Sequence, residues 1–282
     1  MLYEELEAVV KEFSSKGAKK GYILNSLKEY LQNIVLDFIY NNKKYNSELV
    51  FTGGTCLRFC HGLPRLSEDI DFDCVGMIDK EGLASDIAAY FKRTLLFEQI
   101  RHSVKGGNDT IYLKFPILDR LGLTFGNSDV LYVKLDVCVF PQDNISSEVN
   151  TISKFGRYYF LKSYSLPDLM SGKIHAFLTR IFFKGKGNES DFKGRDLFDM
   201  VWFMGKKIEP NLKRIDLMMK GTKYENMPWK ELLKEINKKA SSLKKEYVLS
   251  DLANFIEHPR ELESFMGNYI AVIEQYSSSR SS

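Results

Sequence analysis

The stretch FTGGTCLRFCHGLPRLSEDIDFD, residues 51–73, decides how this chain folds. It begins at the end of the apolar run SELVF, which predicts a short strand, and it ends within DIDFDCV, which predicts another. Between them, Gly53 and Gly54 turn the chain into a short predicted helix that ends near residue 61. Side chains two residues apart on a strand face the same side, so Asp69 and Asp71 project together. The stretch therefore places a carboxylate pair downstream of a glycine turn.

This arrangement predicts a site for a metal and a phosphate chain. Two carboxylates on one short strand repel each other unless a cation lies between them, and Mg²⁺ prefers oxygen ligands together with substrate phosphates. Gly53 and Gly54 lack Cβ atoms, so backbone amides at this helix start can approach a phosphate closely. Thr55 adds a hydroxyl at the same place. We expect the glycine turn to hold a triphosphate and the aspartates to hold the metals that bridge it.

A later strand supplies a third carboxylate. In LYVKLDVCVF, residues 131–140, strand alternation puts Lys134 and Asp136 on one face. An acid in an otherwise apolar strand costs stability unless it is paired or binds a metal. Asp136 is therefore expected either to pair with another group or to bind a metal.

Together these motifs resemble the signature of the DNA polymerase β-like nucleotidyltransferase superfamily. The form with Arg-x-Ser-x-Asp-Ile-Asp-Phe looks more specifically like the AbiEii/AbiGii toxin family. The resemblance implies that Asp69, Asp71 and Asp136 bind two Mg²⁺ ions and are catalytic. It also implies that the nucleotide is held by Gly53, Gly54, Thr55, Arg65, Ser67 and Lys134.

The resemblance continues into the second half of the chain. SGKIHAFLTR and KGRDLFDMVWF look like the later motifs of the family, which makes Lys173 a catalytic and nucleotide-binding lysine near the triphosphate and Asp196 a catalytic residue. The alternative is a structural salt bridge between Lys173 and Asp196 that joins two helices. Arg195 and Asp199 fit a structural role better than a catalytic one.

The predicted fold class is α/β. We expect a nucleotidyltransferase domain with a mixed sheet and N-terminal helices over residues 1–160, followed by a helical domain over residues 161–282 that closes the active-site cleft. The helices predicted along the whole chain include residues 3–14, 23–40, 79–103, 167–183 and 195–205. Its further predicted strands are residues 109–117, 129–140 and 155–160.

Composition limits the class of protein. The chain has 282 residues, a net charge of +3 and four cysteines, which are too few for a disulfide scaffold. Cys56 and Cys60 fit buried thiols better than a zinc site, and their role stays open. No apolar run is long enough to span a membrane, so we expect a cytoplasmic protein without a membrane partner. Between Lys184 and Lys245, 16 Lys and Arg stand against 9 Asp and Glu.

The expected reaction moves a nucleoside monophosphate from an NTP to an acceptor, with Mg²⁺ as cofactor. The resemblance implies a toxin of a toxin–antitoxin or phage-defence system, with a cognate antitoxin as partner and an RNA such as tRNA as acceptor. A protein or small-molecule acceptor is an alternative. The contrasting class is a non-catalytic module that binds NTP or an antitoxin, and the three carboxylates argue against it.

Overall fold

The computed structural model describes residues 2–74, 76–105, 110–124, 128–140, 145–180 and 193–280, together with the backbone of 182–183 and 189–190. The chain divides into two compact units. One comprises Met1–Gln142 and Ser147–Ser163, and the other comprises Asp143–Ser146 and Tyr164–Ser282. Each unit is described separately.

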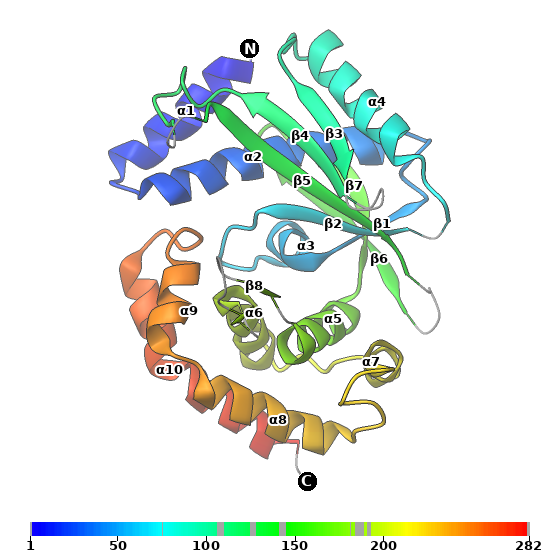
Figure 1. The fold of residues 1–282 in the computed structure, drawn as a ribbon, viewed down its shortest axis with the longest axis vertical. Coiled ribbons are helices and arrows are strands. Elements are labelled where there is room, and N and C mark those ends of the chain that lie inside the picture. The colour runs from blue at the N-terminus through cyan, green and yellow to red at the C-terminus, as the bar shows by residue number, and fades with distance from the viewer. Residues whose placement is uncertain are drawn as a thin grey trace. The chain divides into compact units, whose positions relative to one another are not determined.

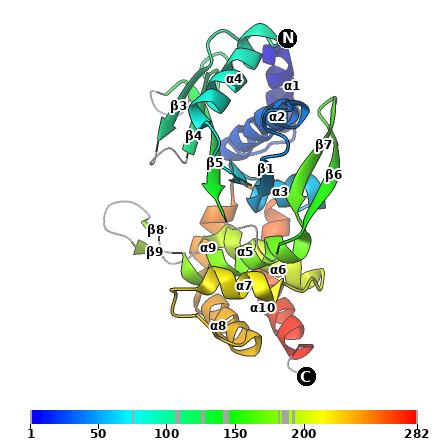
Figure 2. The same cartoon turned by 90° about the vertical axis from the view of Figure 1, so that its right-hand side faces the viewer.

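The first unit is built on a seven-stranded mixed sheet with the strand order β3-β4-β5-β2-β1-β7-β6 (Figures 1 and 2). Its strands are β1 (Leu49–Thr52), β2 (Asp69–Cys74), β3 (Arg101–Lys105), β4 (Thr110–Pro116), β5 (Val130–Val139), β6 (Ser147–Lys154) and β7 (Arg157–Tyr164). Strand β2 is antiparallel to β1 and parallel to β5. These three central strands carry or adjoin the predicted metal ligands. The α/β fold class is confirmed.

The helices described beside this sheet are α1 (Leu2–Ser15), α2 (Lys20–Asn41), α3 (Gly53–His61) and α4 (Lys80–Arg93). The apolar face of α2 buries Leu27, Leu31 and Ile34 at no more than 1% exposure. Helix α2 packs against α1, α4 and β5, and α3 packs against β1, β2 and β6. Burial of these apolar faces against the sheet is the main source of stability of the unit.

The predicted helix over residues 79–103 is wrong in its second half. Helix α4 ends at Arg93, and Leu96 follows with a φ of 53°, which no helix accommodates. Residues Arg101–Lys105 instead form β3, which pairs with β4 so that Val104 lies opposite Ile111.

The aromatic run at residues 155–160 is confirmed as a strand in its later part, because β7 begins at Arg157. Phe155 and Gly156 both have positive φ, 51° and 71°, which is typical of a two-residue hairpin turn. The turn connects β7 to β6, a strand that the sequence reading did not anticipate. Its polar sequence, SEVNTISK, suits the edge position that β6 occupies.

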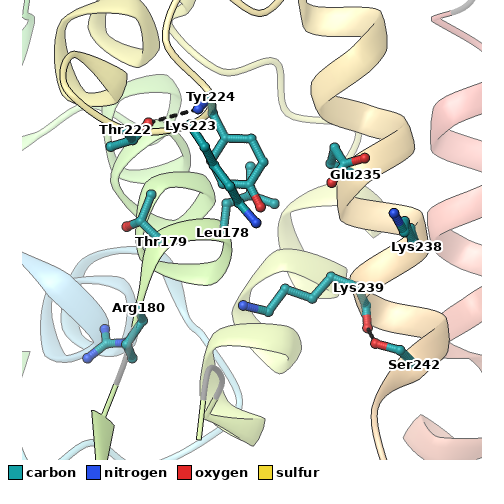
Figure 3. A pocket seen from close by; sticks show the side chains of 10 residues that line it. All are labelled: Leu178, Thr179, Arg180, Thr222, Lys223, Tyr224, Glu235, Lys238, Lys239 and Ser242. Atoms are coloured by element: carbon teal, nitrogen blue, oxygen red, sulfur yellow. Dashed lines mark hydrogen bonds between the residues drawn. The ribbon is translucent and has the colours of Figure 1, made fainter.

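The second unit is helical. Its helices are α5 (Leu166–Thr179), α6 (Gly194–Gly205), α7 (Leu212–Met219), α8 (Trp229–Ser242), α9 (Lys245–Leu252) and α10 (Pro259–Ser278). Helix α5 packs against α6, α7 and α8, and this side of the unit carries a pocket (Figure 3). The predicted helix 167–183 is too long, because Arg180 is extended and Phe182–Phe183 form the strand β8, paired with β9 (Glu189–Ser190). No described helix has the length and apolarity needed to cross a membrane.

Candidate active site

Gly53 is required by the position of Asp71. Gly53 opens α3 with a φ of +78°, and a Cβ atom there would lie 2.0 Å from Asp71 Oδ2. This proximity follows from the pairing of β1 with β2, in which Thr52 lies opposite Asp71. The Asp71 carboxylate therefore packs directly on the glycine turn.

Gly54 is required by two other predicted site residues. A Cβ at Gly54 would lie 2.8 Å from Arg65 Nη2 and 2.9 Å from Ser67 Oγ. Arg65 and Ser67 are only 3% and 8% exposed, and Arg65 Nη1 donates to the backbone carbonyl of Leu66 at 2.8 Å. The segment after α3 thus folds back so that a guanidinium and a hydroxyl cover the N-terminal turn of the helix.

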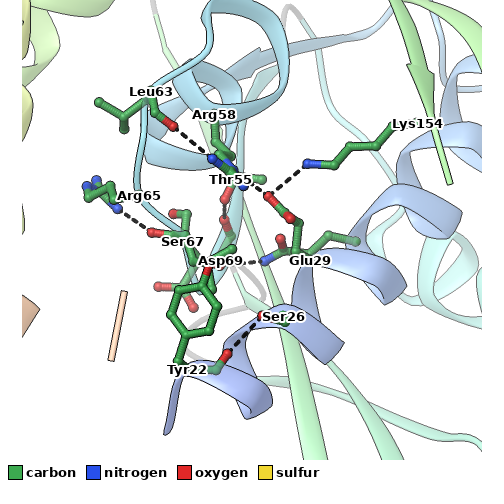
Figure 4. A network of polar contacts seen from close by, with 12 residues as sticks. Tyr22, Ser26, Glu29, Thr55, Arg58, Leu63, Arg65, Ser67, Asp69 and Lys154 are labelled. Carbon is green, nitrogen blue, oxygen red and sulfur yellow. Dashed lines mark hydrogen bonds and ion pairs between the residues drawn. The ribbon is translucent and has the colours of Figure 1, made fainter. Parts of the chain in front are cut away.

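The Thr55 side chain has a different position from the one expected of a phosphate ligand. Thr55 is fully buried, and its hydroxyl donates to the backbone carbonyl of Asp69 (Figure 4). The bond ties α3 to the start of β2. Thr55 therefore positions the aspartate strand relative to the glycine turn.

The three predicted metal ligands share one face of two neighbouring strands. In the parallel register of β2 and β5, Asp71 lies beside Asp136, and Asp69 lies beside Lys134. Lys134 Nζ is 2.5 Å from Asp136 Oδ2, and Thr110 Oγ1 donates to Asp136 Oδ1 at 2.7 Å. Burial acts to lower the pKa of Lys134, but Asp136 and Asp69 outweigh it and raise that pKa above its ordinary value.

A buried ionic network supports the helix behind the glycine turn. Glu29 of α2 contacts Arg58 Nε of α3 at 2.6 Å and Lys154 Nζ of β6 at 2.9 Å (Figure 4). Burial acts to raise the pKa of Glu29, but Lys154 and Arg58 outweigh it and hold the pKa below its ordinary value. Gln32 on the same helix donates to the backbone carbonyl of Glu68 at 2.8 Å. These residues hold α3 and the 67–68 segment in place.

The sequence reading missed this network. The sequence does contain a sign of the network. Glu29 and Gln32 lie on a helix whose neighbouring positions are apolar, and polar groups at buried positions need partners.

The amino-acid sequence matches the family model described as nucleotidyl transferase AbiEii toxin, type IV toxin–antitoxin system, over residues 37–266. The chain belongs to the AbiEii family. It is therefore a nucleotidyltransferase of a toxin family, as the resemblance at the glycine turn and the aspartate strand implied.

Solved structures similar to this chain include two bacterial proteins. MenT4, a nucleotidyltransferase toxin from Mycobacterium tuberculosis H37Rv, is 13% identical, with a TM-score of 0.55 over 96% of this chain and 92% of that chain. JHP933 from Helicobacter pylori is 17% identical, with a TM-score of 0.49 over 89% of this chain and 90% of that chain. At these identities the similarity to MenT4 supports the fold alone. The search of curated proteins found no match to the sequence.

In the helical unit of this AbiEii-family chain, Lys173 and Asp196 do not pair with each other. Lys173 Nζ lies 2.7 Å from Asp199 Oδ2, and the Asp199 side chain is fully buried. Asp196 Oδ2 lies 2.8 Å from Arg180 Nε. The salt bridge considered between Lys173 and Asp196 is thus replaced by two separate pairs. Their catalytic roles remain predictions that rest on the family resemblance.

Arg195 and Asp199, which lie on α6 with Asp196, have partners of their own. Arg195 donates through its backbone amide to Asp251 Oδ2 at 3.0 Å and stacks over the ring of Phe255 at 4.3 Å. Asp199 holds Lys173 between α6 and α5. Both arrangements are those of structural residues, as expected for this pair.

The three predicted metal ligands are of the donor type that suits Mg²⁺. Asp69, Asp71 and Asp136 offer oxygen ligands on one face, which is the donor type that this ion prefers. Within the described residues, however, no three acidic, histidine or cysteine side chains converge as a metal-binding group. The Asp136 carboxylate contacts Lys134 and Thr110 instead, so it would exchange the lysine for a metal on binding.

Proposed function

We propose that this nucleotidyltransferase moves a nucleoside monophosphate from an NTP to the end of an RNA such as tRNA in a magnesium-dependent reaction. The observation that carries the proposal is the packing of Asp71 on Gly53, with Arg65 and Ser67 on Gly54. It brings a carboxylate, a guanidinium and a hydroxyl to the N-terminal turn of a helix. That combination suits a triphosphate with its counterions.

In the proposed reaction, the acceptor hydroxyl oxygen attacks the α-phosphorus, the bond from that phosphorus to the pyrophosphate leaving group breaks, and the hydroxyl proton passes to solvent water. Asp69, Asp71 and Asp136 would hold Mg²⁺, which when bound lowers the pKa of a coordinated hydroxyl and neutralises phosphate charge. Arg65, Ser67 and the amides at Gly53 and Gly54 hold the triphosphate. Lys134 sits beside Asp136 and balances its charge, and it can turn to phosphate when the metal takes its place.

The choice of RNA rests on charge. The segment from Lys184 to Lys245 carries 16 Lys and Arg against 9 Asp and Glu, whereas the rest of the chain carries 24 against 28. Lysine and arginine side chains that contact phosphates supply the sequence-independent part of RNA binding. Membership of the toxin family further supports a role in a toxin–antitoxin system, for which a cognate antitoxin is the expected partner.

The decisive experiment is product identification. Purified protein is incubated with each of the four α-labelled NTPs, Mg²⁺ and either total RNA or a protein extract. We expect labelled RNA of discrete size with wild type, and none with Asp71→Asn or Asp136→Asn. Transfer of label to protein with none to RNA would reject the RNA acceptor. Undiminished transfer by either aspartate variant would reject the metal site.

A further inference from the structure

The sheet of the first unit has one apolar and one polar face. Alternate residues of β5, namely Leu131, Val133 and Leu135, are at most 4% exposed, whereas Tyr132 between them is 45% exposed. Helices α2 and α4 pack against β5, β4 and β3, which accounts for the buried face. The predicted metal ligand Asp136 lies on the other face, the polar one, together with Tyr132.

The polar face continues from β5 across β4 to β3, since residues directly opposite each other on antiparallel strands point to the same side. Tyr132 lies opposite Lys114, and Lys114 lies opposite Arg101. One row nearer the metal ligands, Tyr112 of β4 lies opposite Lys134. The polar face therefore begins at the carboxylates of β2 and β5 and continues as cations and tyrosines over β4 and β3.

Arg101 and Lys114 form a like-charge pair across β3 and β4. Like charges directly opposite each other destabilise a strand pair. Within the described part of the chain, no carboxylate forms an ion pair with either of them. An anion bound over the pair would relieve the repulsion, so this position suits a phosphate of a ligand.

Tyr132 supplies an exposed ring beside these cations. Single-stranded nucleic acids are bound by this combination, because their bases stack on aromatic side chains while cations meet their backbone. An acidic peptide would satisfy the cations alone. The ring beside the cations therefore favours a nucleic acid.

The position of the polar face relative to the glycine turn indicates which nucleic acid it takes. In the sheet order, β1 and its glycine turn lie on one side of the carboxylate strands β2 and β5, whereas β4 and β3 lie on the other side (Figure 1). The attacking and leaving oxygens of a phosphoryl transfer are roughly in line across the phosphorus. Because the proposed function assigns the triphosphate to the glycine turn, the acceptor hydroxyl approaches from the side of β4.

We propose that the polar face of β3, β4 and β5 binds the single-stranded end of the acceptor RNA, with a phosphate over Arg101 and Lys114 and a base on Tyr132. Tyr132 and Asp136 are four residues apart, which is about 13 Å along β5, so the terminal nucleotides span from this contact to the metal ligands. The inference rests on the proposed function, which supplies both the RNA acceptor and the position of the triphosphate.

The charge pair is tested by the binding of a fluorescein-labelled single-stranded RNA, measured by fluorescence anisotropy in EDTA and without NTP so that no transfer occurs. Arg101→Ala/Lys114→Ala is compared with Lys92→Ala/Arg93→Ala, which removes one half-buried lysine and one exposed arginine from α4. Helix α4 packs on the opposite face of the sheet, since its Ser85 contacts His102 of β3. We expect the face variant to bind RNA more weakly than the control, with a log–log salt slope shallower by about 0.7 because one phosphate contact is lost.

The ring is tested in the same assay. Tyr132→Ala is compared with Tyr158→Ala, which removes an exposed tyrosine from β7. We expect Tyr132→Ala to bind RNA about tenfold more weakly than this control, and Tyr132→Phe, which keeps the ring, to bind like wild type. Because the ring variant and the charge variant are independent, either one tests the proposal if the other is unfolded.

Equal RNA binding by the face variants and their controls overturns the inference. If wild type still transfers label to RNA in that case, the proposed function stands and only the assignment of the face is wrong. Transfer of label to protein with none to RNA rejects the proposed function, and this inference with it. Weaker binding of a fluorescent ATP analogue or of polyglutamate by the face variants, with RNA binding unchanged, overturns the inference in favour of the incoming nucleotide or of an acidic peptide.

Discussion

At the residue scale, two glycines explain why a short motif specifies a site. Gly53 has a positive φ and also leaves no room for a Cβ. Gly54 has an ordinary backbone conformation, and only the lack of room for a Cβ requires glycine there. The sequence predicted close approach of a phosphate to this turn. The structure adds that side chains of the chain itself, those of Asp71, Arg65 and Ser67, already occupy the space above it.

The first prediction compares Gly53→Ala with Gly62→Ala. Both glycines have a left-handed φ, +78° and +73°, so alanine costs each about 1–2 kcal/mol in backbone strain. A Cβ at Gly62 meets nothing within 4 Å, but a Cβ at Gly53 displaces Asp71. We expect Gly53→Ala to lower the urea midpoint further than Gly62→Ala and to abolish transfer. Equal midpoints with normal transfer by Gly53→Ala would contradict the role given to this contact.

At the element scale, the buried network of Glu29 links three elements of the first unit. The folded-state pKa of Glu29 is below its ordinary value. The ionised group therefore contributes stability above the unfolded pKa of about 4.3, and this contribution is lost as pH falls through the folded pKa. The network should matter at neutral pH and vanish in acid.

The second prediction concerns Glu29→Gln. Removal of the carboxylate leaves Arg58 and Lys154 without their shared partner and should reduce the free energy of unfolding by about 3 kcal/mol at pH 7. The difference from wild type should shrink below about pH 4. The control is Glu12→Gln, whose exposed pair with Lys16 is worth at most about 1 kcal/mol. A difference that persists unchanged in acid would show that Glu29 acts through packing rather than charge.

The third prediction tests the link between α5 and α6. Asp199 is fully buried beside Lys173, so Lys173→Ala removes the ammonium partner of a buried carboxylate and should destabilise the protein by about 3–5 kcal/mol. Lys173→Ala/Asp199→Ala removes both charges and should recover part of that loss. If the double variant is stable yet inactive, Lys173 is also catalytic. If it retains full transfer, the family-derived role of Lys173 is wrong.

The same pairs show what local sequence cannot supply. Alternation along DIDFDC placed Asp69 and Asp71 on one face, because that property depends on neighbouring residues alone. The partner of Lys173 depends instead on how two helices are rotated, which selected Asp199 over Asp196. The short strand RHSVK had no signal of its own, since its state is set by pairing with β4.

At the scale of the whole molecule, the sequence predicted a sheet-containing part and a helical part. It could not predict the ion pairs that join segments far apart in the chain. Glu29, Arg58 and Lys154 lie far apart in the chain and meet only because α2, α3 and β6 assemble. The charge asymmetry between the segment Lys184–Lys245 and the rest of the chain, in contrast, is a property of composition and can be read from the sequence. The asymmetry allows RNA binding to be tested without reference to any single contact.

The fourth prediction uses that asymmetry. If the acceptor is RNA, each phosphate contact releases counterions, so the logarithm of RNA affinity should fall with the logarithm of salt concentration by about 0.7 per contact. Four contacts give a slope of about −3. Lys244 and Lys245 are exposed residues of the basic segment that do not line the pocket, and their joint replacement by alanine should make the slope shallower by about 1.4.

The matched control is Lys11→Ala/Lys43→Ala, which removes two exposed lysines from the other unit and should leave the slope unchanged. Filter binding of labelled RNA over a series of salt concentrations measures both slopes. Since exposed charges separated by more than about 10 Å are screened at 0.1 M salt, a general loss of net charge cannot imitate a local one. A salt-independent affinity, or equal slopes for the two variants, would mean that the basic segment is a solvated surface with no part in RNA binding.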